Sequence, residues 1–294
     1  MKKPGNIITL SKQEKKLIEA SENIIASPPT GVDIAYIHAI LCQVGLPRSK
    51  VEGREFLRRA GKAWLNVQAG TLDEGRGPIE QPIPYGATPR LALAWVSSHA
   101  VRHRTREIPI GETASEFLRL MGMENTGRRH ATLRKQMHAL AACRLQLGYC
   151  GRTFNGSPIE QFDAWLSDKE TNQRKLWPGV IVLSESYYKT LCEHAVPLDN
   201  RALYALKGSS LALDVYVWLA YRLHTVDHFG TTLSWDALRH QFAQEYKGKN
   251  ANKDFRKDFL NVLEKVSLVY PDALFMKVDG GLKLYSSPPP ILSK

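Results

Sequence analysis

The sequence is poor in cysteine and has no long apolar run. Its four cysteines include no Cys-x-x-Cys pair, so neither a redox motif nor a zinc knuckle is indicated. A metal site formed by scattered ligands is the weaker alternative, and its candidates are His130, His138, Cys143 and Cys150. We expect reduced cysteines and no metal or cofactor. No stretch approaches the ~18 apolar residues that span a bilayer, and no signal peptide follows Met1. We therefore expect a cytoplasmic protein without a membrane partner.

Motifs of nucleotide and strand-cleavage chemistry are also missing. Gly61-Lys62-Ala63 lacks both the upstream glycine and the hydroxyl residue of a phosphate-binding loop. His99 and His103 are four residues apart and have no obvious third metal ligand, unlike the His-apolar-His motif of a nickase. Tyr187-Tyr188 could imitate a nucleophile pair, but no metal site lies beside it in the sequence. We expect no catalytic residues and no enzymatic activity.

The chain carries an excess of positive charge that is grouped. Among 294 residues there are 40 Lys and Arg against 29 Asp and Glu, which gives a net charge of +11. The basic residues cluster at 102–106, 128–135 and 247–257. Such clusters favour a polyanionic partner. The length fits about two domains, and the hydrophobic content of 43% is enough for two cores.

One order of parts occurs twice, about 122 residues apart. Trp95 and Trp218 each lie in an apolar helical stretch, and a short strand, a capped helix, a basic helix and further strands follow each. Arg134-Lys135 and Arg256-Lys257 occupy the polar faces of the two basic helices. The repeat predicts an α+β protein of two tandem winged-helix domains with an N-terminal extension.

The predicted domains are an N-terminal arm (1–29), a first winged-helix domain with a long wing (30–195), a second (196–287) and a tail (288–294). A charged helix over 12–26, ended by Pro28-Pro29, is expected to be solvated or mobile. The apolar spacing over 33–44 predicts a helix, 63–67 a strand, and the Gly- and Pro-rich 70–84 a loop.

In the first unit, Thr88 and Pro89 predict a helix start, 106–110 a strand, and Thr113 with Glu116 a capping box. A basic helix is predicted over 128–143, and strands over 144–149 and 180–183 would enclose the long wing. The aromatic residues of this wing suit either an interface or the core; they are Phe154, Phe162, Trp165 and Trp177. The first unit is accordingly a DNA reader or mainly a dimer module.

In the second unit, helices are predicted over 210–223, from the Ser234 cap to about Tyr246, and over 252–268. A strand is predicted over 230–233, and strands over 273–278 and 282–286 are joined by Asp279-Gly280-Gly281. The apolar residues of 252–268 have the same spacing as those of 128–143.

A winged helix presents its third helix to the major groove, while wing and flanking cations hold phosphates. The candidate DNA-binding residues are Arg128, Arg129, His130, Arg134, Lys135, Lys247, Lys249, Asn252, Lys253, Arg256, Lys257, Lys277 and Lys283. Arg can read guanine with two parallel hydrogen bonds. Asn252 could instead cap its helix, and Asp254 and Asp258 should lie on a flank away from the cations. The alternative is that these residues are ordinary solvated side chains.

Several stretches, in order, resemble the plasmid-encoded RepA replication initiator family. They are Leu41 to Arg48, Pro84 to Leu91, Arg106 to Ile108 and Pro197 to Leu223. The resemblance implies a cytoplasmic protein that binds repeated sites (iterons) in double-stranded DNA at a plasmid origin. It also implies recruitment of host replication proteins, such as the host initiator and the replicative helicase, and a homodimer in equilibrium with a monomer, the dimer repressing its own promoter. The competing hypotheses are a dimeric repressor without initiator activity and a metal-dependent nickase or primase.

Overall fold

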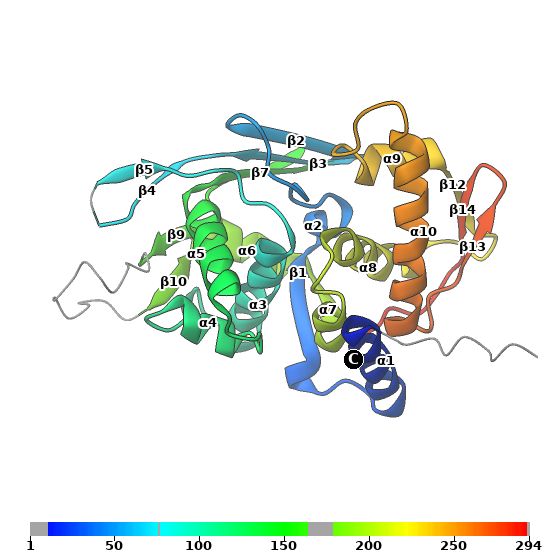
Figure 1. The fold of residues 1–294 in the computed structure, drawn as a ribbon, viewed down its shortest axis with the longest axis horizontal. Helices are drawn as coiled ribbons and strands as arrows, with labels where there is room; N and C mark the ends of the chain where they lie inside the picture. Colours follow the sequence, from blue (N-terminus) through cyan, green and yellow to red (C-terminus); the bar gives the residue numbers. More distant parts are fainter. Residues whose placement is uncertain (1–10, 76, 164–178, 293–294) are drawn as a thin grey trace, which may run out of the picture.

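The computed structural model describes residues 11–75, 77–163 and 179–292, which form an α+β fold (Figure 1). Before the repeated part, the chain forms helices, strands and a single 3-10 turn, η1. They are α1 (Lys12–Ala26), η1 (Gly31–Asp33), β1 (Ile34–His38), α2 (Ala39–Gln43), β2 (Glu55–Ala60), β3 (Ala63–Gln68), β4 (Thr71–Asp73) and β5 (Pro78–Glu80). None of the described helices is long and apolar enough to cross a membrane.

The first repeated unit comprises α3 (Ala87–His103), β6 (Glu107–Pro109), α4 (Ala114–Leu120), α5 (Gly127–Ala142), β9 (Ile159–Phe162) and β10 (Val180–Leu183). Inserted in it is the hairpin of β7 (Arg144–Tyr149) and β8 (Arg152–Gly156). Between the units lie α6 (Glu185–Glu193), β11 (Ala195–Asp199) and α7 (Asn200–Ala205). The second unit comprises α8 (Ser210–Arg222), η2 (Leu223–Thr225), β12 (Thr231–Ser234), α9 (Trp235–Phe242), α10 (Ala251–Val269), β13 (Phe275–Val278) and β14 (Gly281–Leu284).

The duplication read from the sequence is present in the sheets. In the first unit the antiparallel order is β6-β10-β9, and in the second it is β12-β14-β13. In both, the last strand of the unit pairs between the other two. Because Val278 lies opposite Gly281 in the β13–β14 pair, the turn consists of Asp279 and Gly280. Gly280 has a positive φ of 79°, which glycine adopts without strain.

Local patterns predicted the second unit closely. Phe255, Phe259 and Val266 of α10 are buried on one face, as their spacing requires. Ser234 caps α9 by accepting a hydrogen bond from the Ala237 amide. In the first unit Thr113 caps α4 in the same way, but Glu116 accepts from the Glu112 amide instead of closing the predicted box.

Five further sequence predictions were wrong in detail. The 33–44 stretch is β1 followed by α2, since β1 pairs with β11 far along the chain. The 70–84 stretch contains the β4–β5 hairpin, and α3 begins after Gly86, before Thr88. The strands β7 and β10 do not enclose one wing, because β7 pairs with β3 and β8 while β10 pairs with β6 and β9. The helix α9 ends at Phe242.

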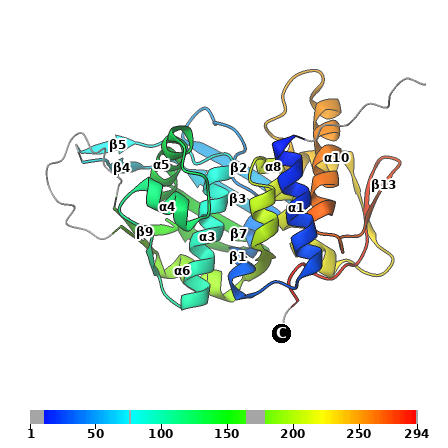
Figure 2. The same ribbon diagram turned by 60° about the horizontal axis from the view of Figure 1, so that its bottom comes forward.

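The helix predicted over 12–26 is confirmed, but it packs against the protein and is not a mobile arm. The helix α1 lies against α7 (Figure 1) and α10 (Figure 2). Its Leu17 is buried, and the guanidinium of Arg201 in α7 donates to the Asn23 and Ser27 carbonyls. An amphipathic helix gains stability by covering apolar surface, so a charged outer face does not imply a free helix.

Buried ion pairs join the two halves of the molecule, of which the first runs from α1 to β10 and the second from α8 to β14. Arg90 in α3 donates to both carboxylate oxygens of Asp214 in α8, at 2.7 and 2.8 Å, and its side chain is 8% exposed. After α9, Glu245 accepts from Arg48 at 2.8 Å and from Arg58 at 2.5 Å. Burial raises the pKa of Glu245, but the charges of Arg58 and Arg48 and the hydrogen bonds from Arg48 outweigh it, and the pKa falls to about 2. The position of the second unit is therefore fixed against the first.

Candidate nucleic-acid interface

The strongest basic site lies on α10 and the two elements beside it. A pocket of about 540 Å³, here the α10 pocket, is bounded by α9, α10 and β13. Its lining contains Asn252, Lys253, Arg256, Lys257 and Lys277. Five residues of the predicted set thus come together, although they are spread over 26 positions of the sequence.

Two lining residues were missed from the sequence. Trp235 and Arg239 are one helical turn apart on α9 and face the pocket. The indole Nε1 of Trp235 and the Nε of Arg239 are shielded from solvent and have no hydrogen-bond partner among the described residues. The i, i+4 spacing of these two side chains beside a basic helix was the signal available. Unpaired buried donors are unusual, and they suit a ligand that supplies acceptors.

Arg256 is held in place by an aromatic ring. Its guanidinium carbon lies 4.8 Å from the centre of the Trp235 ring. Stacking of this kind orders a long side chain while its donors stay free at the edge. Asp236 is the one carboxylate residue in the lining. Asp258 is not part of the lining, which agrees with its predicted place on a flank, and it accepts a hydrogen bond from the Tyr246 hydroxyl.

Asn252 does not cap α10. The helix begins at Ala251 after Asn250, so Asn252 lies inside the first turn, where its exposed amide lines the pocket. Lys247 and Lys249 are exposed in the turn that precedes the helix and do not line the pocket. The structure therefore contradicts the cap for Asn252, and its contact with adenine stays a prediction.

The two lysines of the C-terminal hairpin point to opposite faces of the sheet. Lys277 is opposite the buried Leu282 and faces α10, whereas Lys283 is opposite the exposed Met276. Side chains alternate along a strand, so the two cannot share a surface. The Lys283 ammonium lies 5.1 Å from the centre of the Tyr285 ring.

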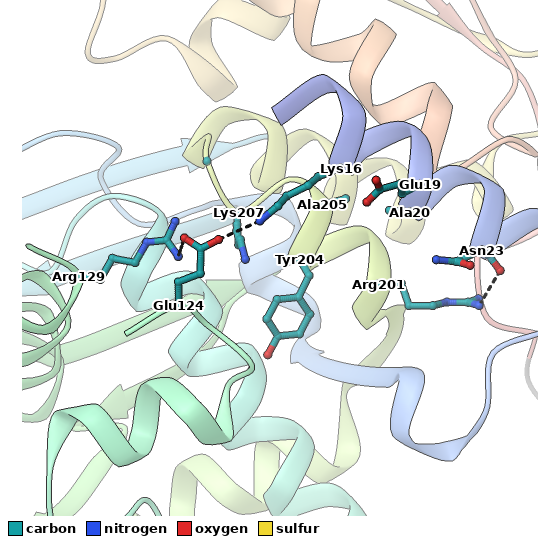
Figure 3. Close-up of a pocket in the computed structure, with 11 residues that line it drawn as sticks. Lys16, Glu19, Ala20, Asn23, Glu124, Arg129, Arg201, Tyr204, Ala205 and Lys207 are labelled. Atoms are coloured by element: carbon teal, nitrogen blue, oxygen red, sulfur yellow. Dashed lines mark hydrogen bonds and ion pairs between the residues drawn. The ribbon is translucent and has the colours of Figure 1, made fainter. Parts of the chain in front are cut away.

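The basic residues of α5 do not form one surface. Arg128 and Lys135 are exposed and two turns apart on one face, whereas His130 and Arg134 are half-buried. Arg129 faces a groove under α1, where it pairs with Glu124 at 3.2 Å and Glu124 pairs with Lys16 at 2.9 Å (Figure 3). Only Arg128 and Lys135 of the predicted five are thus presented together to solvent on α5.

No metal site is formed by the described residues. Cys143 is buried, which raises its pKa to about 12, while Cys150 is exposed in the turn between β7 and β8. Tyr187 is also wholly buried, with its pKa raised to about 12 by burial. Phe154 and Phe162 pack against the core; Trp165 and Trp177 lie outside the described residues.

The model of the plasmid-encoded RepA protein family matches residues 83–237, which is more than half of the chain. The chain belongs to this family of plasmid replication initiators. The match runs from the residues before α3 to the start of α9, and so includes Arg90 and Asp214. No curated protein sequence matches significantly.

Two crystal structures of domains 2 and 3 of RctB have the same fold as this chain. Both match with a TM-score of 0.52, at 12% and 11% sequence identity. The match covers 84% of this chain and 96% and 98% of theirs. At such low identity the likeness is one of fold, and it spans both halves of the molecule.

Proposed function

We propose that this protein initiates plasmid replication by binding repeated sequences in the double-stranded DNA of its origin, without catalysis of its own. The observation that carries the proposal is the α10 pocket, where five cations face one carboxylate and two buried donors are unpaired. The α10 helix would enter the major groove, with Arg256 and Asn252 toward base edges and Lys277 toward a phosphate.

The two units would not contribute equally. On α5 only Arg128 and Lys135 stand free on one face, and Arg129 is held by Glu124. We infer that the second unit supplies most of the sequence preference and that α5 adds phosphate contacts. Dimerisation, self-repression and recruitment of host proteins belong to the same proposal as expectations from the family.

A binding assay on the origin of the plasmid that encodes the protein tests the α10 assignment. Arg256→Ala should cost about 1–3 kcal/mol and relax base preference, and Arg256→Lys should lose preference while the salt dependence is kept. Lys277→Ala should weaken all sequences alike and lower the salt slope by about one. Lys265→Ala is the matched control, since it lies nine residues beyond Arg256 and so on the opposite side of α10. Unchanged binding by Arg256→Ala would refute the assignment.

Two further experiments separate the other functions. Replication of a test plasmid with the cognate origin should depend on this protein. DNA binding without replication would instead favour the hypothesis of a repressor without initiator activity. Incubation with supercoiled DNA and Mg²⁺ should leave the DNA intact, and nicking would contradict the absence of catalysis.

A further inference from the structure

A second basic pocket lies where the β2–β3 turn meets α8 and α9. It measures about 580 Å³, and we call it the inter-half pocket because each half supplies part of it. Arg59 and Lys62 come from the β2–β3 hairpin, Arg222 ends α8, and His240 belongs to α9. Its lining contains no aspartate or glutamate. The remaining lining residues are neutral, so the pocket carries a net positive charge.

Within the described residues, no ion pair is found for the cations of this pocket. The Nε of Arg222 is shielded from solvent and has no partner among the described residues. Arg59 and Lys62 are exposed, and no ion pair of theirs is found in the described parts. The neighbouring Arg58, by contrast, pairs with Glu245, and in the groove under α1 Glu124 separates Lys16 from Arg129 (Figure 3). At those two places a carboxylate thus lies beside the gathered cations.

We propose that the inter-half pocket binds a phosphate group. A guanidinium offers parallel donors that match two phosphate oxygens, and a lysine adds a mobile point charge. The phosphate belongs either to the backbone of bound DNA or to a free phosphate compound, and both present the same oxygens. Since Arg59 and Lys62 belong to one half and Arg222 to the other, an occupied pocket holds the halves together. This site is separate from the α10 pocket. Only the alternative in which the phosphate belongs to bound DNA rests on the proposed function.

The first experiment titrates the full chain with inorganic phosphate at constant ionic strength. The variant Arg59→Gln/Lys62→Gln changes two exposed side chains and should keep the fold, which circular dichroism checks. We expect at least tenfold weaker phosphate binding. The control Lys50→Gln/Lys265→Gln removes the same charge from exposed positions outside the pocket and should bind as the unchanged protein does. Arg222→Lys keeps the charge but removes the parallel donors, and should also weaken binding.

The second experiment identifies the source of the phosphate. Log affinity for origin DNA is measured against log salt for the same variants. If backbone phosphate occupies the pocket, Arg59→Gln/Lys62→Gln should lower the slope by about 1.8 relative to the control, at ~0.9 per contact. A slope equal to the control, with weakened inorganic phosphate binding, assigns the pocket to a free phosphate compound. The proposal is overturned if neither measurement separates the variant from its control. Because the phosphate titration uses no DNA, failure of the proposed function would be seen separately.

Discussion

Removal of the Asp214 carboxylate should strongly destabilise the protein. Arg90 donates two charge-assisted hydrogen bonds to it, and three more to the carbonyls of Leu46, Pro47 and Gly86. Each charge-assisted bond contributes about 1.5–3 kcal/mol. The Asp214→Ala variant keeps the guanidinium buried with neutral acceptors alone, so the free energy of unfolding should fall by about 3–5 kcal/mol.

Urea unfolding of the full chain, followed by tryptophan fluorescence, measures this loss. Lys16→Ala is the control, because Lys16 and Glu124 are both about half exposed and such a pair contributes about 0–1 kcal/mol. The double variant Arg90→Met/Asp214→Leu should recover part of the stability, since it leaves no unpaired charge. If Asp214→Ala costs no more than Lys16→Ala, the buried pair does not hold the two halves together.

Two other predictions concern the same junction. The pKa of Glu245 lies at about 2, below its ordinary 4.5, so this carboxylate stabilises the fold above pH 4.5 and loses its contribution as the pH falls from 4.5 to about 2. Glu245→Gln should remove about 3 kcal/mol of that acid sensitivity, as urea unfolding between pH 5 and pH 2 would show; an unchanged acid slope would contradict it. A Cβ on Gly45 would lie 2.5 Å from Oδ1 of Asp214, so Gly45→Ala should destabilise by about 1–3 kcal/mol. Gly31→Ala, where a Cβ meets nothing within 4 Å, is its control, and equal thermal stability of the two would refute the clash.

Local patterns gave the second unit almost completely. The apolar spacing that makes α10 amphipathic and the turn signal of Asp279-Gly280 are both local in the sequence. The candidate site on α10 followed from the same phase argument. Trp235 and Arg239 were missed because they belong to the preceding helix, and only packing brings them to the same pocket.

Predictions failed where the partner is distant in the chain. The residues of β1 have helical spacing, yet they pair with β11, which begins at Ala195. The long first wing was predicted from the positions of the strands alone. No local pattern in the sequence of β7 indicates that it pairs with β3. The resemblance identified Leu41 to Arg48 and the stretch around Asp214 as family motifs. That Arg90 binds both of them depends on the tertiary structure and could not be predicted from the motifs.

The docking of α1 has a consequence for how the chain is made. The helix α1 precedes α10 in the chain, so it leaves the ribosome before α10, against which it packs, has been synthesised. Until α10 is made, the apolar side of α1 is not covered by its final partner. The contact between α1 and α10 joins segments far apart in the sequence, so it forms late in folding. A fragment with residues 196–294 alone would expose the surface of α7 and α10 that α1 normally covers. DNA affinity measured on such a fragment would therefore be that of a module that lacks one of its packed faces.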